Sequence, residues 1–450
     1  MMWPCPSNSF EFRFCRVPCY KPDIRLNQCS FTTGLPCILM SKTDRNRVSP
    51  LSSTGNRFLS HVMQAVLRHH VPDHAPNPWV TDIYYEEVRL DGEDDPCQGP
   101  YVMPLVTLRT NPCRWSASAG CVMCGYHLGA NRQPVTDEML IAQTEDAISR
   151  LNPRVYPSLV FTSNGSFFDR AEVSDEVRPI LARKLHEAGF RYLIVESRPE
   201  YLTPGRLRAL AEAFSPNGAA SAGRYPLSVS FGLESANDFV QRYCINKGRR
   251  RADYLAAFEL LRREGYAYDC YVLLGKPFMT AREDVADAID TIRFAVDHGA
   301  DYVFVMVTNM VDYGLTSYLH ERGRYQLPSL WRAIELLERL PGRYRRHVQI
   351  KGISHAPVPP RYYARTCEFC TEHVKGAINF WNQTGEMEHI RSIHRCGCRR
   401  EFTGGEWSEH PAHSLTERVL EEYRMLAEEL DLDPALLPDR EALDLVGVAV

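Results

Sequence analysis

The sequence lacks the long hydrophobic runs of a membrane protein, because no apolar stretch reaches the 18 residues typical of a spanning helix. Arg13 and Arg16 are not followed by the apolar core of a signal peptide, so we expect a cytoplasmic protein. An excess of basic charge is also missing, since the formal net charge at pH 7 is −4. This balance argues against a whole-surface affinity for nucleic acid and leaves room only for a local basic groove.

What the sequence contains is an ordinary globular composition, with 44% hydrophobic and 24% charged residues in a chain of 450. Its 15 cysteines are an odd number in a large chain, which disfavours a complete disulfide framework. Clustered thiols in a reducing compartment more often bind metal than pair with one another. Two groups of closely spaced cysteines, at residues 113–124 and 367–398, are therefore candidate metal sites.

A strand–helix rhythm runs through the middle of the chain. Six near-continuously apolar segments, each followed by a helical pattern, lie at 101–110, 158–165, 191–200, 227–235, 268–277 and 301–310. Apolar strands of this kind are typical of a parallel sheet covered on both faces, either a barrel or an open wound sheet. In both folds the functional residues gather in the loops that follow the strands.

The same pattern predicts how the chain is divided. Residues 1–55 are expected to form a disordered N-terminal segment, and residues 56–345 the strand–helix domain. Residues 346–412 are expected to form a cysteine-rich metal-binding region, and residues 413–450 a C-terminal helix and tail. The fold class predicted from these parts is α/β: a partial parallel (β/α)6 barrel with a cysteine-rich extension.

The first cysteine cluster lies in "NPCRWSASAGCVMCGYHLGA", directly after the first predicted strand. Its pattern is too irregular for a helix or a strand. Cys113, Cys121 and Cys124 could ligate three irons of a 4Fe–4S cube and leave the fourth open to a cofactor. A zinc site completed by His127, or three merely structural thiols, are the alternatives.

The surrounding motifs resemble the radical S-adenosylmethionine superfamily. "CVMCGY", "SNGSFFD", "ESRPEY" and "GLES…INKG" are similar to the branch that holds elongator-type subunits and the archaeosine-forming enzyme. The resemblance covers about residues 100–345, although seven residues separate the first two cysteines where the superfamily usually has three. It implies a partial barrel, a 4Fe–4S cluster and S-adenosyl-L-methionine as cofactors, and an electron donor such as flavodoxin or ferredoxin.

The resemblance also implies roles for individual residues. Cys113, Cys121 and Cys124 would ligate the cluster, and Met123 would pack against adenine. The other cofactor contacts would come from the loops after the second, third and fourth strands: Ser163, Asn164, Gly165, Glu196, Arg198, Ser230 and Glu234. Glu196 could instead form a salt bridge with Arg198.

Three residues at later strand ends are candidate catalytic groups. Lys276 ends the fifth strand, and Asp312 and Tyr313 follow the sixth. A desolvated lysine changes its pKa readily and can serve as an acid or base. Lys276 could equally anchor an anion or be a plain surface lysine, and the same uncertainty holds for the other two.

The second cluster, C-x2-C-x25-C-x-C, comprises Cys367, Cys370, Cys396 and Cys398. Two close pairs of thiols are the usual way to close a tetrahedral site, which favours structural zinc over an auxiliary 4Fe–4S cluster. His373 or His394 could replace one cysteine. Arg395, Arg399 and Arg400 stand beside the thiols and could contact an anionic ligand.

Three functions compete. In size and motif order the chain resembles the radical diol dehydratases of aminoglycoside (apramycin) biosynthesis, which implies hydrogen abstraction, dehydration of a sugar diol and a partner dehydrogenase. The acidic net charge favours that polycationic small molecule over the tRNA that an archaeosine-forming enzyme would modify. The third possibility is a zinc-stabilised binding protein without enzymatic activity.

Overall fold

The computed structural model divides the chain into two units, Met1–Arg47 and Val48–Val450. It describes residues 55–67, 77–89, 101–126, 130–131, 133–216, 218, 225–312, 314–353, 361–393, 396–440 and 443, all within the second unit. The expectation of a disordered segment at residues 1–55 therefore falls almost wholly outside the described residues.

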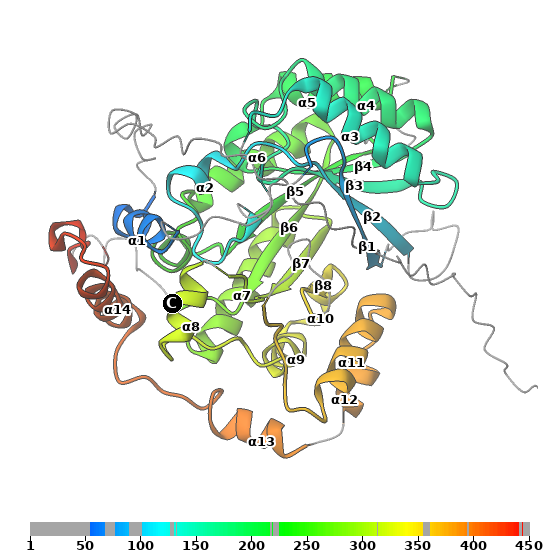
Figure 1. Ribbon diagram of the computed structural model, residues 1–450. Coiled ribbons are helices and arrows are strands. Elements are labelled where there is room, and N and C mark those ends of the chain that lie inside the picture. The colour runs from blue at the N-terminus through cyan, green and yellow to red at the C-terminus, as the bar shows by residue number, and fades with distance from the viewer. Residues whose placement is uncertain are drawn as a thin grey trace, which may run out of the picture. The chain divides into compact units, whose positions relative to one another are not determined.

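One eight-stranded sheet organises the second unit, with its strands in the order β1 to β8 (Figure 1). The six predicted strands are all present, and each is parallel to the next along the chain. They are β2 (Tyr101–Thr107), β3 (Ser158–Thr162), β4 (Tyr192–Glu196), β5 (Leu227–Glu234), β6 (Ala267–Leu274) and β7 (Tyr302–Val307). The predicted α/β class and partial parallel barrel are confirmed.

Two strands at the sheet edges were not predicted. The strand β1 (Asp82–Val88) pairs antiparallel with β2, and β8 (Val348–Lys351) pairs parallel with β7. The side chain of Asn382 forms two hydrogen bonds to the backbone of Ile350 on β8. The Asn382 amide oxygen accepts from the Ile350 N–H at 2.8 Å, and the Asn382 amide nitrogen donates to the Ile350 carbonyl at 2.7 Å. Asn382 thus takes the place that a further strand would occupy at this edge.

Helices follow the strands and cover the sheet. They are α3 (Asp137–Arg150), α4 (Val177–Ala188), α5 (Pro204–Phe214), α6 (Arg251–Glu264), α7 (Ala281–Asp297) and α9 (Trp331–Arg339). Three of them begin at a capping threonine. The Thr136 and Thr203 side chains accept bonds from free N–H groups of α3 and α5. Thr280 and Glu283 form a reciprocal capping box at α7.

The two faces of the sheet differ in chemistry. On β5, Leu227, Val229 and Phe231 belong to the apolar core that the covering helices share. Because side chains alternate along a strand, Ser228 and Ser230 point to the opposite face, where both bond the Asp269 carboxylate of β6, at 2.8 and 3.5 Å. The apolar runs of the sequence therefore include polar groups that line the inner face of the partial barrel.

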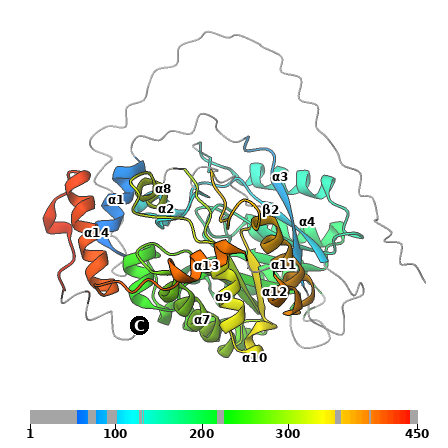
Figure 2. The same ribbon diagram turned by 90° about the horizontal axis from the view of Figure 1, so that it is seen from below.

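The cysteine-rich region is mostly helical. It contains α11 (Thr371–Thr384), α12 (Glu388–Ser392) and α13 (Gly397–Gly404), which lie beside α9 in Figure 2. Although β8 lies beyond residue 345, it is part of the barrel sheet. The predicted domain boundaries remain predictions.

Other helices of this unit are shorter or peripheral. They include α1 (Arg57–Leu67), α8 (Leu315–Glu321), α10 (Gly342–Arg345) and the predicted C-terminal helix α14 (Leu415–Glu429). The helices α1 and α14 lie side by side (Figure 1). The rings of Phe58 on α1 and Tyr423 on α14 are 4.7 Å apart. Within the described residues, every helix is too short or too polar to cross a membrane.

Candidate functional site

The loop after β2 brings the three predicted ligands together. Cys113, Cys121 and Cys124 pack with Trp115 in one small apolar cluster, and Met123 packs against it as well. The loop is less irregular than predicted, because Arg114–Ser118 form the short helix α2 directly after Cys113. The backbone N–H of Cys124 donates to the carbonyl of Cys121 at 3.1 Å, which sets the turn between the last two thiols.

Neighbouring loops hold this cysteine loop in place. Trp115 donates its indole N–H to the carbonyl of Asn246 at 2.8 Å, and the Asn246 side chain donates to the carbonyl of Gly120, also at 2.8 Å. Asn246 adopts a left-handed backbone conformation, which asparagine tolerates better than most residues. A Cβ on Gly248 would lie 2.5 Å from the Trp115 ring, so the "INKG" segment needs its glycine there.

The three thiols are not arranged as the ligands of a single ion. Among the described residues, the three sulfurs do not form a set within 4.8 Å of one another, as ligands of one ion would. Burial raises the pKa of Cys113 to about 11 and that of Cys124 to about 12. Such thiols ionise when a bound metal supplies the positive charge. The alternative zinc ligand His127 lies outside the described residues.

The loop after β3 packs against the loop that carries the thiols. A Cβ on Gly165 would lie 2.5 Å from the Cβ of Cys113, so this glycine permits the close approach of the two loops. Ser163 donates its hydroxyl to Glu172 at 2.8 Å, and the Asn164 amide donates to the carbonyl of Thr110 at 3.2 Å. The predicted cofactor contacts of Ser163, Asn164 and Gly165 remain predictions.

Glu172 is a buried acid that the sequence analysis missed. Besides Ser163, it accepts bonds from the Thr110 hydroxyl at 3.2 Å and the Ser166 N–H at 3.0 Å. Burial raises the pKa of its carboxyl to about 7. It ties the loop after β2 to the loop after β3. No sequence signal marks it, because its partners lie on separate loops.

Glu196 and Arg198 lie at the end of β4. The salt bridge between them, which was the alternative prediction, does not form, because each has other partners. Glu196 accepts from the hydroxyls of Thr162 at 2.6 Å and Tyr271 at 2.7 Å, and burial raises the pKa of its carboxyl. Arg198 pairs with Glu200 at 2.7 Å and lies over the Trp115 ring, 5.5 Å from its centroid. Arg198 therefore contacts the thiol loop, and Glu196 faces the inner side of the sheet.

The end of β5 carries an ion pair that the sequence analysis missed. Glu234 pairs with Lys247 of the "INKG" segment at 3.0 Å, and both side chains are largely buried. A Cβ on Gly232 would lie 2.6 Å from the Lys247 ammonium, so the glycine makes room for the pair. Ser230, the other predicted contact on this strand, lies 3.5 Å from Asp269.

The three predicted catalytic groups are not brought together among the described residues. Lys276 is fully buried and pairs with Asp284 at 2.7 Å and Asp287 at 3.3 Å, both on α7. Asp312 is half-buried and pairs with Arg361 at 3.5 Å. Tyr313 lies outside the described residues. A catalytic role for any of them stays a prediction, and the surroundings of Lys276 favour a structural role.

The second thiol cluster assembles as predicted. The sulfurs of Cys367, Cys370, Cys396 and Cys398 all lie within 4.8 Å of one another, close enough to share one ion. The Trp331 indole donates to the Cys398 sulfur at 3.4 Å, which joins the cluster to α9. The His373 ring is instead 3.1 Å from the carbonyl of Phe369, and His394 lies outside the described residues.

No family model matches the chain. It is 31% identical over 300 residues to the archaeosine synthase subunit beta of Methanosarcina acetivorans, covering 65% of this chain and 82% of that relative. The subunit of the same name from Thermococcus kodakarensis is 30% identical over 249 residues, covering 54% and 74% of the two chains. The solved structure of Methanocaldococcus infernus Elp3 with an N-terminal deletion aligns at a TM-score of 0.40 and 18% identity, covering 57% and 60%.

Proposed function

The chain belongs to the family of the archaeosine synthase beta subunits, and from this premise we propose that it is a radical S-adenosylmethionine enzyme that modifies a tRNA nucleoside. One observation carries the chemistry: three cysteines gather in the loop that follows the first parallel strand of a partial barrel. That is the edge at which the loops of a parallel barrel form an active site.

Cys113, Cys121 and Cys124 would hold a 4Fe–4S cluster, and three thiols leave one iron open for the methionyl group of S-adenosyl-L-methionine. When bound, this pair of cofactors supplies a 5′-deoxyadenosyl radical able to abstract hydrogen from an unactivated carbon. Met123, next to the thiols, would pack against the adenine. The protein's own task is to orient both partners and to exclude water.

The residues around the thiol loop suit that task. Arg198 lies over the Trp115 ring of the thiol loop, and Glu200 and Asn246 hold the two side chains in place. Lys247 and Glu234 place a buried pair of opposite charges at the next strand end. We propose that these groups, with Glu196, form the polar contacts of the nucleoside cofactor and of the substrate.

The relatives favour tRNA over the aminoglycoside expected from net charge, because both are archaeosine synthase subunits. Net charge is a weak guide here, since a single basic groove suffices to bind RNA. The relatives support neither sugar-diol dehydration nor a partner dehydrogenase. The word "subunit" in their names supports a second protein as partner, and an electron donor such as flavodoxin or ferredoxin is required.

Anaerobic reconstitution with iron and sulfide tests the proposal. The wild-type protein should turn brown and release 5′-deoxyadenosine from S-adenosyl-L-methionine under reductant, faster with tRNA than with an aminoglycoside. Cys124→Ala should lose both colour and release, whereas the control Cys244→Ala, a buried cysteine outside both clusters, should keep them.

Two outcomes would contradict it. Faster release with an aminoglycoside would restore sugar-diol chemistry as the function. A colourless protein that contains zinc alone would indicate the non-enzymatic binding protein.

A further inference from the structure

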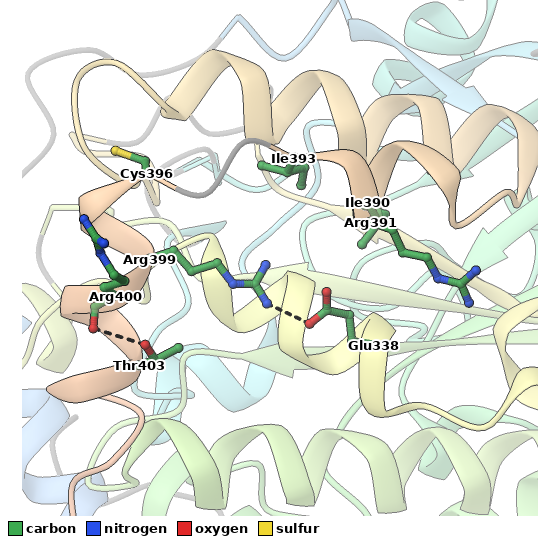
Figure 3. A pocket seen from close by; sticks show the side chains of 8 residues that line it. All are labelled: Glu338, Ile390, Arg391, Ile393, Cys396, Arg399, Arg400 and Thr403. Atoms are coloured by element: carbon green, nitrogen blue, oxygen red, sulfur yellow. Dashed lines mark hydrogen bonds and ion pairs between the residues drawn. The ribbon is translucent and has the colours of Figure 1, made fainter.

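A basic cavity lies beside the second thiol cluster. It measures about 270 Å³ and is lined by Glu338, Ile390, Arg391, Ile393, Cys396, Arg399, Arg400 and Thr403 (Figure 3). Three arginines face one glutamate in this lining, so the cavity is positively charged in a chain whose formal net charge is −4. A positive cavity on an acidic protein is suited to an anionic ligand.

The three arginines are held differently. Arg399 is fixed, because it donates to Glu338 at 2.7 Å and to Glu335 at 3.2 Å and lies over the Trp331 ring. Figure 3 shows Arg399 reaching Glu338, with Arg391 beyond that carboxylate and Arg400 beside Cys396. Within the described part of the chain, the guanidinium groups of Arg391 and Arg400 make no hydrogen bond or ion pair, and both residues are exposed. They are free to bind a ligand.

An exposed aromatic ring lies on the same module. Phe369 occupies the turn between Cys367 and Cys370, and 80% of its surface is exposed. The sulfurs of Cys367 and Cys396 are 3.9 Å apart, so the turn that carries Phe369 and the lining of the basic cavity meet at one thiol cluster. A large apolar side chain this exposed needs an explanation, and a binding partner is one.

We propose that this cysteine-rich module is an RNA-docking site: Arg391 and Arg400 contact backbone phosphates, and Phe369 stacks on an unpaired base. Arginine forks match phosphate oxygens, and aromatic rings stack on bases that leave the helix. The four thiols hold both elements in place through one bound metal ion. The inference rests on the proposed tRNA substrate and adds the surface that would capture it.

Salt-dependent binding of tRNA to the metal-loaded full-length protein tests the phosphate contacts. The double variant R391A/R400A should weaken binding, and its log–log slope against salt concentration should fall by about two, one per lost contact. The control R183A/R208A removes two exposed arginines on α4 and α5 and should leave the slope unchanged. Zinc and iron content and 5′-deoxyadenosine release without RNA should match wild type in both variants.

The stacking contact has its own test. Phe369→Ala should weaken binding of tRNA by about five- to a hundred-fold, and Phe369→Tyr, which keeps the ring, should bind like wild type. The zinc content of both variants should equal that of wild type, which shows that the turn still folds.

The outcomes separate this inference from the proposed function. If wild type binds tRNA and R391A/R400A binds it with the same affinity and slope, the docking site is wrong while the proposed function stands. If the variant keeps tRNA but loses the purified partner subunit, the cavity is a protein interface and the inference is overturned. If wild type does not bind tRNA at low salt, both the inference and the proposed substrate fall.

Discussion

Gly165 lies so close to Cys113 that a Cβ on the glycine would fall 2.5 Å from the cysteine Cβ and 2.9 Å from its sulfur. Gly165→Ala should therefore displace the first cluster ligand, at a cost of about 1–3 kcal/mol in the free energy of unfolding. Iron bound per chain after reconstitution should fall below that of wild type. Gly205→Ala is the matched control, because nothing lies within 4 Å of a Cβ there. Equal iron content in both variants would contradict the assigned contact.

Lys276 offers a test between catalysis and structure. Its fully buried ammonium pairs with Asp284 and Asp287, so Lys276→Met leaves Asp287 without its cation and Asp284 with Arg332 alone. We expect the free energy of unfolding in urea to fall by about 3–5 kcal/mol. The control Lys184→Met removes a partly exposed pair with Glu145 and should cost less than about 1 kcal/mol. A variant of wild-type stability that has lost only turnover would instead indicate a catalytic lysine.

The raised pKa of the buried Asp269 carboxyl predicts that the stability of the fold depends on pH. Burial raises the pKa of its carboxyl from 3.8 to about 7, so the folded state holds a proton that the unfolded state has already released. This group's contribution to stability is complete below about pH 4 and is lost as the pH rises to 7. Asp269→Asn, which stays neutral, should gain about 2 kcal/mol relative to wild type between pH 5.5 and pH 8.

Urea unfolding at the two pH values measures this gain. Asp290→Asn, an exposed change on α7, is the control and should follow wild type at both. If the difference between Asp269→Asn and wild type is the same at pH 5.5 and pH 8, the carboxyl does not titrate in this range.

The second thiol cluster should bind one metal ion through four sulfurs. Cys398→Ser removes a ligand and also the acceptor of the Trp331 indole, so we expect loss of the ion and lower stability of the cysteine-rich region. Elemental analysis should find about one zinc per chain in wild type and in Cys244→Ala, and much less in Cys398→Ser. Iron in place of zinc would identify an auxiliary cluster, and unchanged metal content in Cys398→Ser would exclude this site.

The sequence predicted the core of the fold well because its signals are local. Each of the six parallel strands is a strong apolar run, and the helices α3, α5 and α7 that follow three of them begin at a threonine N-cap. The strand β1 was missed because Glu86 and Glu87 give it the charge of a solvated loop, although Glu86 pairs with Lys351 across the sheet at 3.6 Å. The strand β8 was missed because four residues are too few to show a period.

The site was harder to predict because its contacts join distant residues. Cysteine spacing identified both thiol clusters, since ligand type and count are visible in the chain. Glu172 and Lys247 gave no such signal, because Glu172 binds Thr110, 62 residues away, and Lys247 binds Glu234, 13 residues away, on another loop. Lys276 was misleading: it follows a strand, but Gly275 takes a positive φ of 108° and the lysine ends among acids of α7. Position at a strand end does not fix where a side chain points.

The two hydrogen bonds between Asn382 and the backbone of Ile350 show that the cysteine-rich region also covers the edge strand β8 of the sheet. An uncovered edge strand presents unpaired N–H and C=O groups to which a strand of another chain can pair. In this protein the Asn382 amide of α11 already occupies these groups at Ile350. Loss of the ion from the four sulfurs would loosen the segment that carries this amide. The uncovered strand could then recruit a second molecule, so metal-depleted protein should form intermolecular sheets before it loses its barrel.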